Sequence, residues 1–155
     1  MTRTFAPAAV FAVIALMALC QCTKSGGDNG SDVTVTLTPA ASAALAGAGK
    51  GIIVDGFYYG APVPATQAKT DEAGRITLGE DQVAATGRSA KLRLPGTGLD
   101  TVLVDKAVIR DARPMIQVTV YSETTAANLL ACSTFDGTVA DAHKTGVAIA
   151  CDVKK

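Results

Sequence analysis

Two cysteines near the C-terminus, Cys132 and Cys151, carry the clearest chemical signal in this chain. Cys151 falls on the inward face of a segment in which apolar and polar residues alternate. Neither belongs to a Cys-x-x-Cys pattern, and no second histidine could complete a soft-metal site with them. In an oxidising compartment we expect a structural disulfide, which closes a loop of about 20 residues and stabilises the fold by roughly 3 kcal/mol.

The single histidine, His143, lies in the polar stretch Asp141-Ala-His-Lys144. A Ser-His-Asp triad needs an aspartate to orient the imidazole, and Asp141 is too close in sequence for that role. No Gly-x-Ser-x-Gly pattern supplies a nucleophile. Catalytic zinc takes three protein ligands, which one histidine with scattered carboxylates does not provide. We therefore expect an exposed loop histidine, and we predict neither a catalytic residue nor a metal ligand.

Two acidic pairs, Asp71-Glu72 and Glu80-Asp81, flank a short predicted strand over residues 75–78. Calcium binding needs several oxygen ligands together, and the two acids of a glycosidase lie within about 10 Å of each other. An extended strand between the pairs would separate them by up to roughly 25–30 Å. We therefore interpret both pairs as solvated turn residues.

Composition excludes several classes of partner and cofactor. The chain balances 14 basic against 14 acidic residues without a basic cluster, so nucleic acid is not expected as a partner. It has no tryptophan, and few aromatic residues remain to build a stacking platform. Gly96-Thr-Gly98 follows a predicted strand, but no third glycine and no helical pattern come after it, so this is a turn and not a nucleotide-binding loop. No cofactor is predicted.

One aromatic cluster, Phe57-Tyr-Tyr59, occurs in an alternating segment over residues 51–59. Alternation places Tyr58 in the core and puts Phe57 and Tyr59 together on the opposite face. If that face is exposed, the two rings form an apolar strip of the kind that marks an interface. They could equally lie under the proline-rich loop that follows. Phe57 and Tyr59 are thus candidate interface residues.

The N-terminal segment has the features of a secretory leader. One basic residue, Arg3, precedes an apolar run over residues 6–19, which Cys20 and Cys22 follow. Such a run suits a signal peptide and is shorter than the roughly 20 residues of a membrane-spanning helix, which makes an uncleaved anchor the weaker alternative. The leader resembles a bacterial lipoprotein signal, where Leu, a small residue and Gly or Ala precede a lipidated cysteine. The resemblance covers only this leader and implies lipid attachment at Cys22 or, alternatively, at Cys20.

Counting cysteines favours Cys22. If Cys22 carries the lipid, Cys20 leaves with the signal and an even pair remains, whereas lipid on Cys20 leaves an odd thiol. The predicted organisation is a signal peptide over residues 1–21, a flexible tether over 22–32 that is rich in Gly, Ser, Asn and Asp, and a domain over 33–155. Ordinary signal cleavage, giving a soluble periplasmic or secreted protein, is the alternative.

The domain shows the period-two alternation of short β-strands. Thr38 and Pro39 have the residue types of a helix start, and residues 123–131 favour a short helix or turn. The predicted fold is all-β: an antiparallel β-sandwich, immunoglobulin-like or transthyretin-like, with a small barrel as the alternative. Its seven predicted strands cover residues 33–38, 51–59, 75–78, 90–94, 102–109, 116–121 and 147–153.

A leader, a tether, a disulfide and no catalytic set together predict a non-enzymatic lipoprotein of the bacterial cell envelope. It would face the periplasm, more readily from the outer than from the inner membrane, and bind or scaffold another envelope protein. The alternative is a periplasmic inhibitor of a hydrolase, either a protease or a lysozyme, because a rigid loop loses little entropy on binding. Residues 60–70 and 133–144 are the candidate inhibitory loops.

Overall fold

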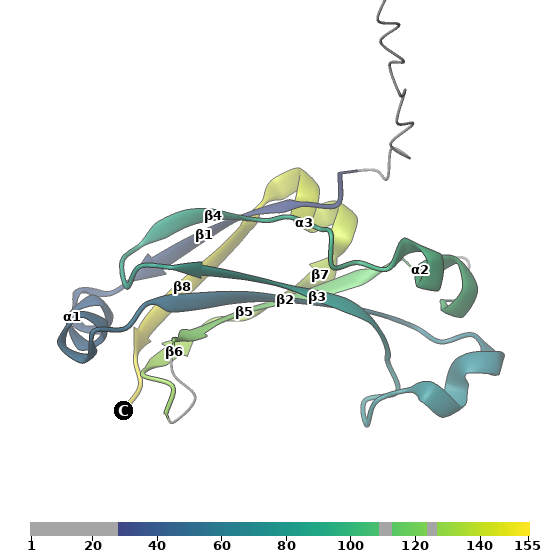
Figure 1. The fold of residues 1–155 in the computed structure, drawn as a ribbon, viewed down its shortest axis with the longest axis horizontal. Helices are drawn as coiled ribbons and strands as arrows, with labels where there is room; N and C mark the ends of the chain where they lie inside the picture. The colour runs from purple at the N-terminus through teal and green to yellow at the C-terminus, as the bar shows by residue number, and fades with distance from the viewer. Residues whose placement is uncertain (1–27, 109–112, 124–126) are drawn as a thin grey trace, which may run out of the picture.

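A computed structural model describes residues 28–108, 113–123 and 127–155. Within these ranges the chain forms eight strands in two four-stranded sheets, with short helices between them (Figure 1). The strands are β1 (Ser31–Leu37), β2 (Ile52–Gly60), β3 (Ile76–Ala85), β4 (Ala90–Leu94), β5 (Met115–Ser122), β6 (Leu130–Cys132), β7 (Phe135–Thr138) and β8 (Val147–Val153). The helices are α1 (Pro39–Ala48), the 3-10 helix η1 (Pro64–Lys69), α2 (Thr101–Ala107) and α3 (Val139–Thr145).

The two sheets have the orders β4-β1-β8-β6 and β3-β2-β5-β7, and they lie as two layers (Figure 1). All strand pairs are antiparallel except β1 and β8, which run parallel. The architecture is therefore mostly β and sandwich-like, with two sheets rich in antiparallel pairs, as the alternation predicts. The parallel pair brings the first and last strands side by side in the middle of one sheet.

Alternation within each strand builds the core between the sheets. In β1, Val33, Val35 and Leu37 are buried while Thr34 and Thr36 face solvent. Tyr58 of β2 is fully buried, as the alternation predicts. Burying one face of every strand supplies the main stabilising term, because apolar area leaves water.

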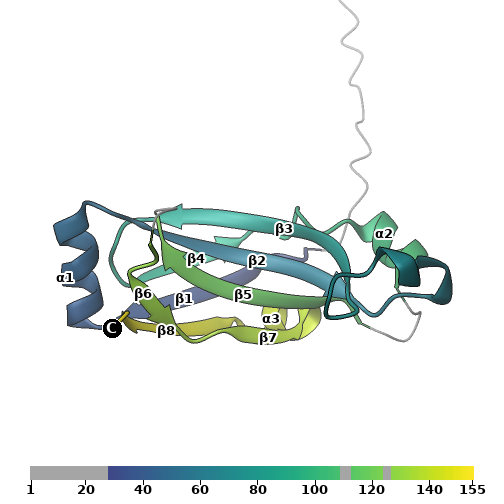
Figure 2. The same cartoon turned by 90° about the horizontal axis from the view of Figure 1, so that it is seen from below.

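Helix α1 closes one end of the sandwich (Figure 2). Thr38 caps it by accepting a hydrogen bond from the Ala41 backbone amide, and Pro39 occupies the first turn. The left-handed Gly49 ends the helix. Leu45 packs into the core from this end. The predicted helix start at Thr38 and Pro39 is confirmed.

The prediction of a strand over residues 102–109 is wrong, because Thr101–Ala107 forms α2. The Asp100 carboxylate accepts a hydrogen bond from the Leu103 amide and so caps the helix. Leu103 and Val104 pack against the core from this helix. The cap and the tertiary packing outweigh the extended preference of the β-branched valines.

Two short strands between residues 123 and 139 were not predicted. Residues 124–126 of the expected helix or turn at 123–131 lie outside the described residues; its last two residues, Leu130 and Ala131, belong to β6. β7 pairs with β5, and β6 pairs with β8. Strands of three and four residues are too short to show a period in sequence.

The domain also begins earlier than expected. β1 starts at Ser31, and Asp28 already bonds to Arg93 of β4. Residues 28–32, placed in the predicted tether, thus belong to the folded domain. The predicted signal peptide and residues 22–27 of the tether, with both candidate lipid sites, Cys20 and Cys22, lie outside the described residues. No helix in the described part of the chain is long and apolar enough to cross a membrane.

Candidate binding surface

Cys132 and Cys151 form the predicted disulfide. They sit opposite each other in the β6–β8 ladder, with Cα atoms 4.0 Å apart. Cys151 is buried and Cys132 is partly buried against the core. The bond therefore ties the three-residue β6 to the last strand, which is a structural role.

Asp81 corrects the interpretation of the second acidic pair, because its carboxylate is buried. β3 continues to Ala85, and its register with β2 shifts between Tyr58 and Tyr59, where Gly79 adopts φ +125°. This bulge changes which side chains face inward, so that Asp81 points into the sandwich and Glu80 to solvent.

Both oxygens of the buried Asp81 carboxylate accept hydrogen bonds. It accepts hydrogen bonds from the Tyr58 hydroxyl at 2.8 Å and from the Gly96 and Gly98 amides at 2.8 and 2.9 Å. Burial and this hydrogen bond raise the pKa of Tyr58 well above that of a free tyrosine. These bonds attach the predicted turn at residues 96–98 to β3, so Asp81 stabilises the fold and offers no free ligand atom.

The first acidic pair does form a turn. Asp71 accepts hydrogen bonds from the Ala73 and Arg75 amides and pairs with the Arg75 guanidinium at 2.9 Å. Hydrogen bonding to the Arg75 amide is the main cause of the lowered pKa of Asp71. In the described ranges no three His, Cys, Asp or Glu residues group in a way that could hold a metal ion.

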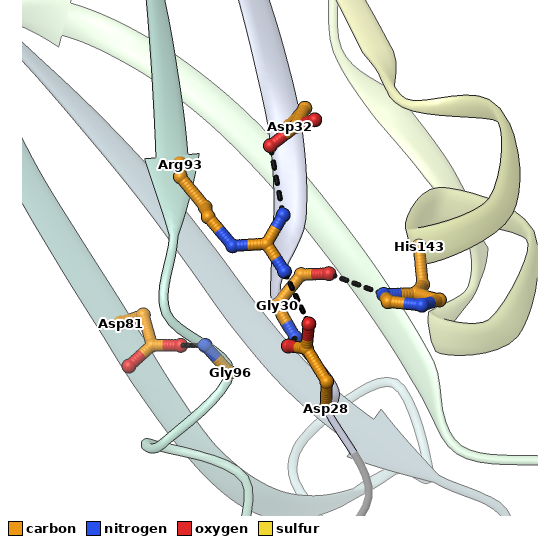
Figure 3. A network of polar contacts seen from close by, with 7 residues as sticks. All are labelled: Asp28, Gly30, Asp32, Asp81, Arg93, Gly96 and His143. Carbon is orange, nitrogen blue, oxygen red and sulfur yellow. Dashed lines mark hydrogen bonds and ion pairs between the residues drawn. The ribbon is translucent and has the colours of Figure 1, made fainter.

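Arg93, on the outer face of β4, holds the start of β1 (Figure 3). Its guanidinium pairs with Asp28 at 2.6 Å and with Asp32 at 2.8 Å. Asp28 also accepts a hydrogen bond from the Gly30 amide, and that bond, ahead of Arg93, lowers the pKa of Asp28. One cation thus faces two anions here.

His143 is exposed as predicted, but it lies on α3 and not in a loop. Its Nδ1 donates a hydrogen bond to the Gly30 carbonyl at 2.7 Å (Figure 3), since a carbonyl can only accept. A groove of about 640 Å³ lies beside it, with Lys91, Arg93 and Lys144 among its lining residues. The histidine therefore helps to fix the first residues of the domain.

Phe57 and Tyr59 lie on the outer face of β2, opposite the buried Tyr58, and both are half-buried. Their rings stack with centroids 6.0 Å apart. The Arg75 guanidinium lies over both rings, 5.3 Å from the centroid of Phe57 and 4.7 Å from that of Tyr59. The Tyr59 hydroxyl donates a short hydrogen bond to Asp136 of β7. Burial, ahead of Asp136, raises the pKa of Tyr59.

A pocket of about 520 Å³ continues from Tyr59 at the end of this sheet. Ala61, Met115 and the Tyr59 ring give it apolar walls, and Arg75 and Arg113 bring two positive charges. Arg113 is exposed and makes no ion pair with any described residue. We call the outer-face residues Phe57, Tyr59 and Arg75, together with this pocket, the aromatic–arginine surface.

Sequence reasoning found Phe57 and Tyr59 but missed the residues around them. Met115 lies beside Tyr59 because the two are paired in the β2–β5 ladder. Arg75 precedes β3 and reaches the rings through the β2–β3 pairing. Nothing in one sequence specifies these pairings. The chain matches no family model, no curated protein and no solved structure.

Proposed function

We propose that this protein is a non-enzymatic lipoprotein of the bacterial cell envelope that binds or scaffolds another envelope protein through the aromatic–arginine surface. The observation that carries the binding role is the stack of Phe57 and Tyr59 under Arg75, half-buried on the outer face of a sheet. Aromatic and arginine side chains are enriched in protein interfaces and at the positions that dominate their affinity.

Three of the groups that could do chemistry already serve the fold. Asp81 is engaged by three donors, Cys132 is bonded to Cys151, and His143 donates to a backbone carbonyl. Groups used in this way are poor candidates for an acid, a base or a nucleophile, which favours binding over catalysis.

The start of the folded region supports a short connection to a lipid anchor. Asp28 is fixed to Arg93, and Cys22 precedes it by six residues. Six residues span at most about 20 Å. A lipid on Cys22 would therefore hold the domain close to the bilayer, with the outer face of β4 nearest to the anchor point.

Mass spectrometry of the natively produced protein tests the anchor. Membrane and soluble fractions are separated, and the N-terminal peptide is measured in each. The proposal predicts a diacylglyceryl Cys22 in the membrane fraction. An unmodified N-terminus beyond Cys22 in the soluble fraction overturns the anchor and favours a freely diffusing protein.

Co-purification tests the binding role. Native protein and the Phe57→Ser/Tyr59→Ser double variant are isolated after mild cross-linking, with Thr34→Ser on the opposite sheet as the control. We expect a partner that co-purifies with native protein and the control and is lost from the double variant. Retention of the partner by a folded double variant contradicts the proposed surface.

The alternative is a periplasmic inhibitor of a protease or lysozyme. The observation in its favour is that the predicted loop 60–70 borders the pocket through Gly60 and Ala61 and carries η1. The other candidate, residues 133–144, is not a loop, because it contains β7 and most of α3. Dose-dependent loss of hydrolase activity when the protein is added supports this function.

The assignment of the two-sheet fold to an immunoglobulin-like or transthyretin-like sandwich is also a proposal.

A further inference from the structure

We propose that the pocket between Tyr59 and Arg113 binds the C-terminal carboxylate of a partner polypeptide whose last side chain is apolar. This inference deepens the proposed function and rests on it. It names the chemistry that the aromatic–arginine surface recognises.

The walls of the pocket select an apolar group. Tyr59 contributes a ring that Phe57 and Arg75 hold in place, and Met115 contributes a flexible thioether beside it. Methionine packs well against aromatic groups and adapts to irregular shapes. The volume of about 520 Å³ lies in the usual range for small-ligand sites and suits one large side chain with its adjoining backbone.

The charge of the pocket selects an anion. In the described part of the chain, the charged residues that line it are two arginines, Arg75 and Arg113. A guanidinium presents paired N–H donors that match the two oxygens of a carboxylate. A carboxylate that binds here therefore meets two guanidinium groups and no acid among the described lining residues.

Arg75 is already oriented for this role. Its Nε donates a hydrogen bond to Asp71, and its guanidinium lies over two rings. Holding the group in place before binding lowers the entropy that is lost on association. Among the described residues, Arg113 has no ion-pair partner that binding would displace.

Two described acids near the pocket are engaged by other groups. Asp136 accepts the hydrogen bond of the Tyr59 hydroxyl, and Asp71 accepts three bonds within its turn. Neither lines the pocket. The groove beside His143 differs, because Arg93 is paired there with both Asp28 and Asp32, and Asp32 lines the groove. The pocket at Arg113 instead places arginines beside apolar walls, which is the combination that a carboxylate next to an apolar side chain requires.

A chemical-shift titration of the ¹⁵N-labelled mature chain, disulfide intact, tests the assignment. The probe is N-acetyl-phenylalanine, which carries a free carboxylate next to an aromatic side chain. N-acetyl-phenylalanine amide removes the charge, and N-acetylglycine removes the apolar group. For a probe of this size we expect a Kd on the order of 1 mM. Shifts should centre on the amides of Tyr59, Gly60, Ala61 and Gly74.

Variants make the test specific. Arg113→Gln should weaken N-acetyl-phenylalanine binding about tenfold. Arg113→Lys should weaken it less, because lysine keeps the positive charge but lacks the paired N–H donors of a guanidinium. Arg88→Gln, an exposed arginine elsewhere, is the matched control and should leave the Kd unchanged. Equal binding of the amide, shifts centred away from the pocket, or no shifts at all overturns the proposal.

Failure here is distinguishable from failure of the proposed function. If Phe57→Ser/Tyr59→Ser abolishes co-purification of a partner while N-acetyl-phenylalanine does not bind, the surface stands and the carboxylate assignment is wrong. If N-acetyl-phenylalanine binds at Arg113 but the double variant keeps its partner, the pocket stands and the proposed interface is wrong.

Discussion

Arg75 and Arg93 are both surface arginines held by aspartates, yet their surroundings differ. Arg93 faces two carboxylates, Asp28 and Asp32, on a face whose other strand residues are mostly small or polar. Arg75 faces one carboxylate, lies over two aromatic rings and adjoins Arg113, which makes no ion pair with a described residue. In the first arrangement two carboxylates outweigh the charge of Arg93, and the pairs fasten the start of β1 to β4. The second retains positive charge next to apolar surface.

This difference shows why a surface ion pair alone says little about function. Exposed pairs contribute roughly 0–1 kcal/mol of stability wherever they occur. What separates the two regions is the balance of charge and the apolar area beside it, because these decide whether a partner can gain by binding. The following predictions test that contrast, from the largest expected effect to the smallest.

Removing the disulfide should lower the stability of the protein without weakening binding at the pocket of the other sheet. Cys132 and Cys151 belong to the sheet that carries Arg93, so Cys132→Ser/Cys151→Ser should lower the free energy of unfolding by roughly 3 kcal/mol. The folded fraction of the variant should still bind N-acetyl-phenylalanine at the distant pocket. Denaturant unfolding and titration measure both effects. Loss of binding by fully folded variant protein would show that the two regions are coupled.

Asp81 and Glu80 compare how much a buried and an exposed carboxylate contribute to the free energy of unfolding. Asp81→Ala leaves the Tyr58 hydroxyl and the Gly96 and Gly98 amides without their acceptor, and should lower the free energy of unfolding by about 2–3 kcal/mol. Glu80→Ala, one residue away and exposed, should change it by less than about 0.5 kcal/mol. Equal effects in denaturant unfolding would contradict the inward orientation of Asp81.

Phe57→Ser tests how far the stacked rings serve the fold. Because the Phe57 side chain is half-buried, its loss should lower the free energy of unfolding by only about 1 kcal/mol. Thr34→Ser on the opposite sheet should be nearly neutral. Thermal or denaturant unfolding measures both variants. A loss of 3 kcal/mol or more, typical of a core phenylalanine replaced by a small residue, would assign Phe57 to the core instead of the binding surface.

The smallest effect concerns the titration of Asp28. The Gly30 amide and Arg93 lower its pKa in the folded state, so its stabilising contribution is present above the unfolded pKa and is lost as pH falls through the lower, folded value. Arg93→Gln should raise this pKa towards that of a free aspartate. Carboxyl NMR titration of Asp28 in the native chain and in the variant follows this pKa directly. An unchanged titration in the variant would mean that Arg93 does not neutralise Asp28.

Local pattern accounts for much of the fold. β4 occurs at the predicted residues, with Lys91 and Arg93 outward and Leu94 buried, because alternation depends only on neighbouring residues. Asp81 was predicted to be a solvated turn residue because the expected strand ended at residue 78. β3 instead continues to Ala85, and a bulge at Gly79, which one sequence does not reveal, turns Asp81 inward. Helix α2 was missed because its cap and packing override strand propensity.

The candidate site was predictable only in part. Phe57 and Tyr59 are neighbours on one strand, so alternation placed them on a common face. Arg75, Arg113 and Met115 come from other segments, and strand pairing brings them beside Tyr59. Since pairing is a tertiary property, the charge of the pocket was invisible in sequence.

Photo-crosslinking from the two outer faces tests the contrast most directly. A benzoylphenylalanine replaces Gln117, which pairs with Phe57 on the aromatic face, or Ala148 on the opposite sheet, in protein produced in its native envelope. We expect one discrete crosslinked product from position 117, lost when Tyr59→Ser is added, and none from position 148. Crosslinking only from position 148, or from neither position, would contradict the assignment of the aromatic–arginine surface as the binding face.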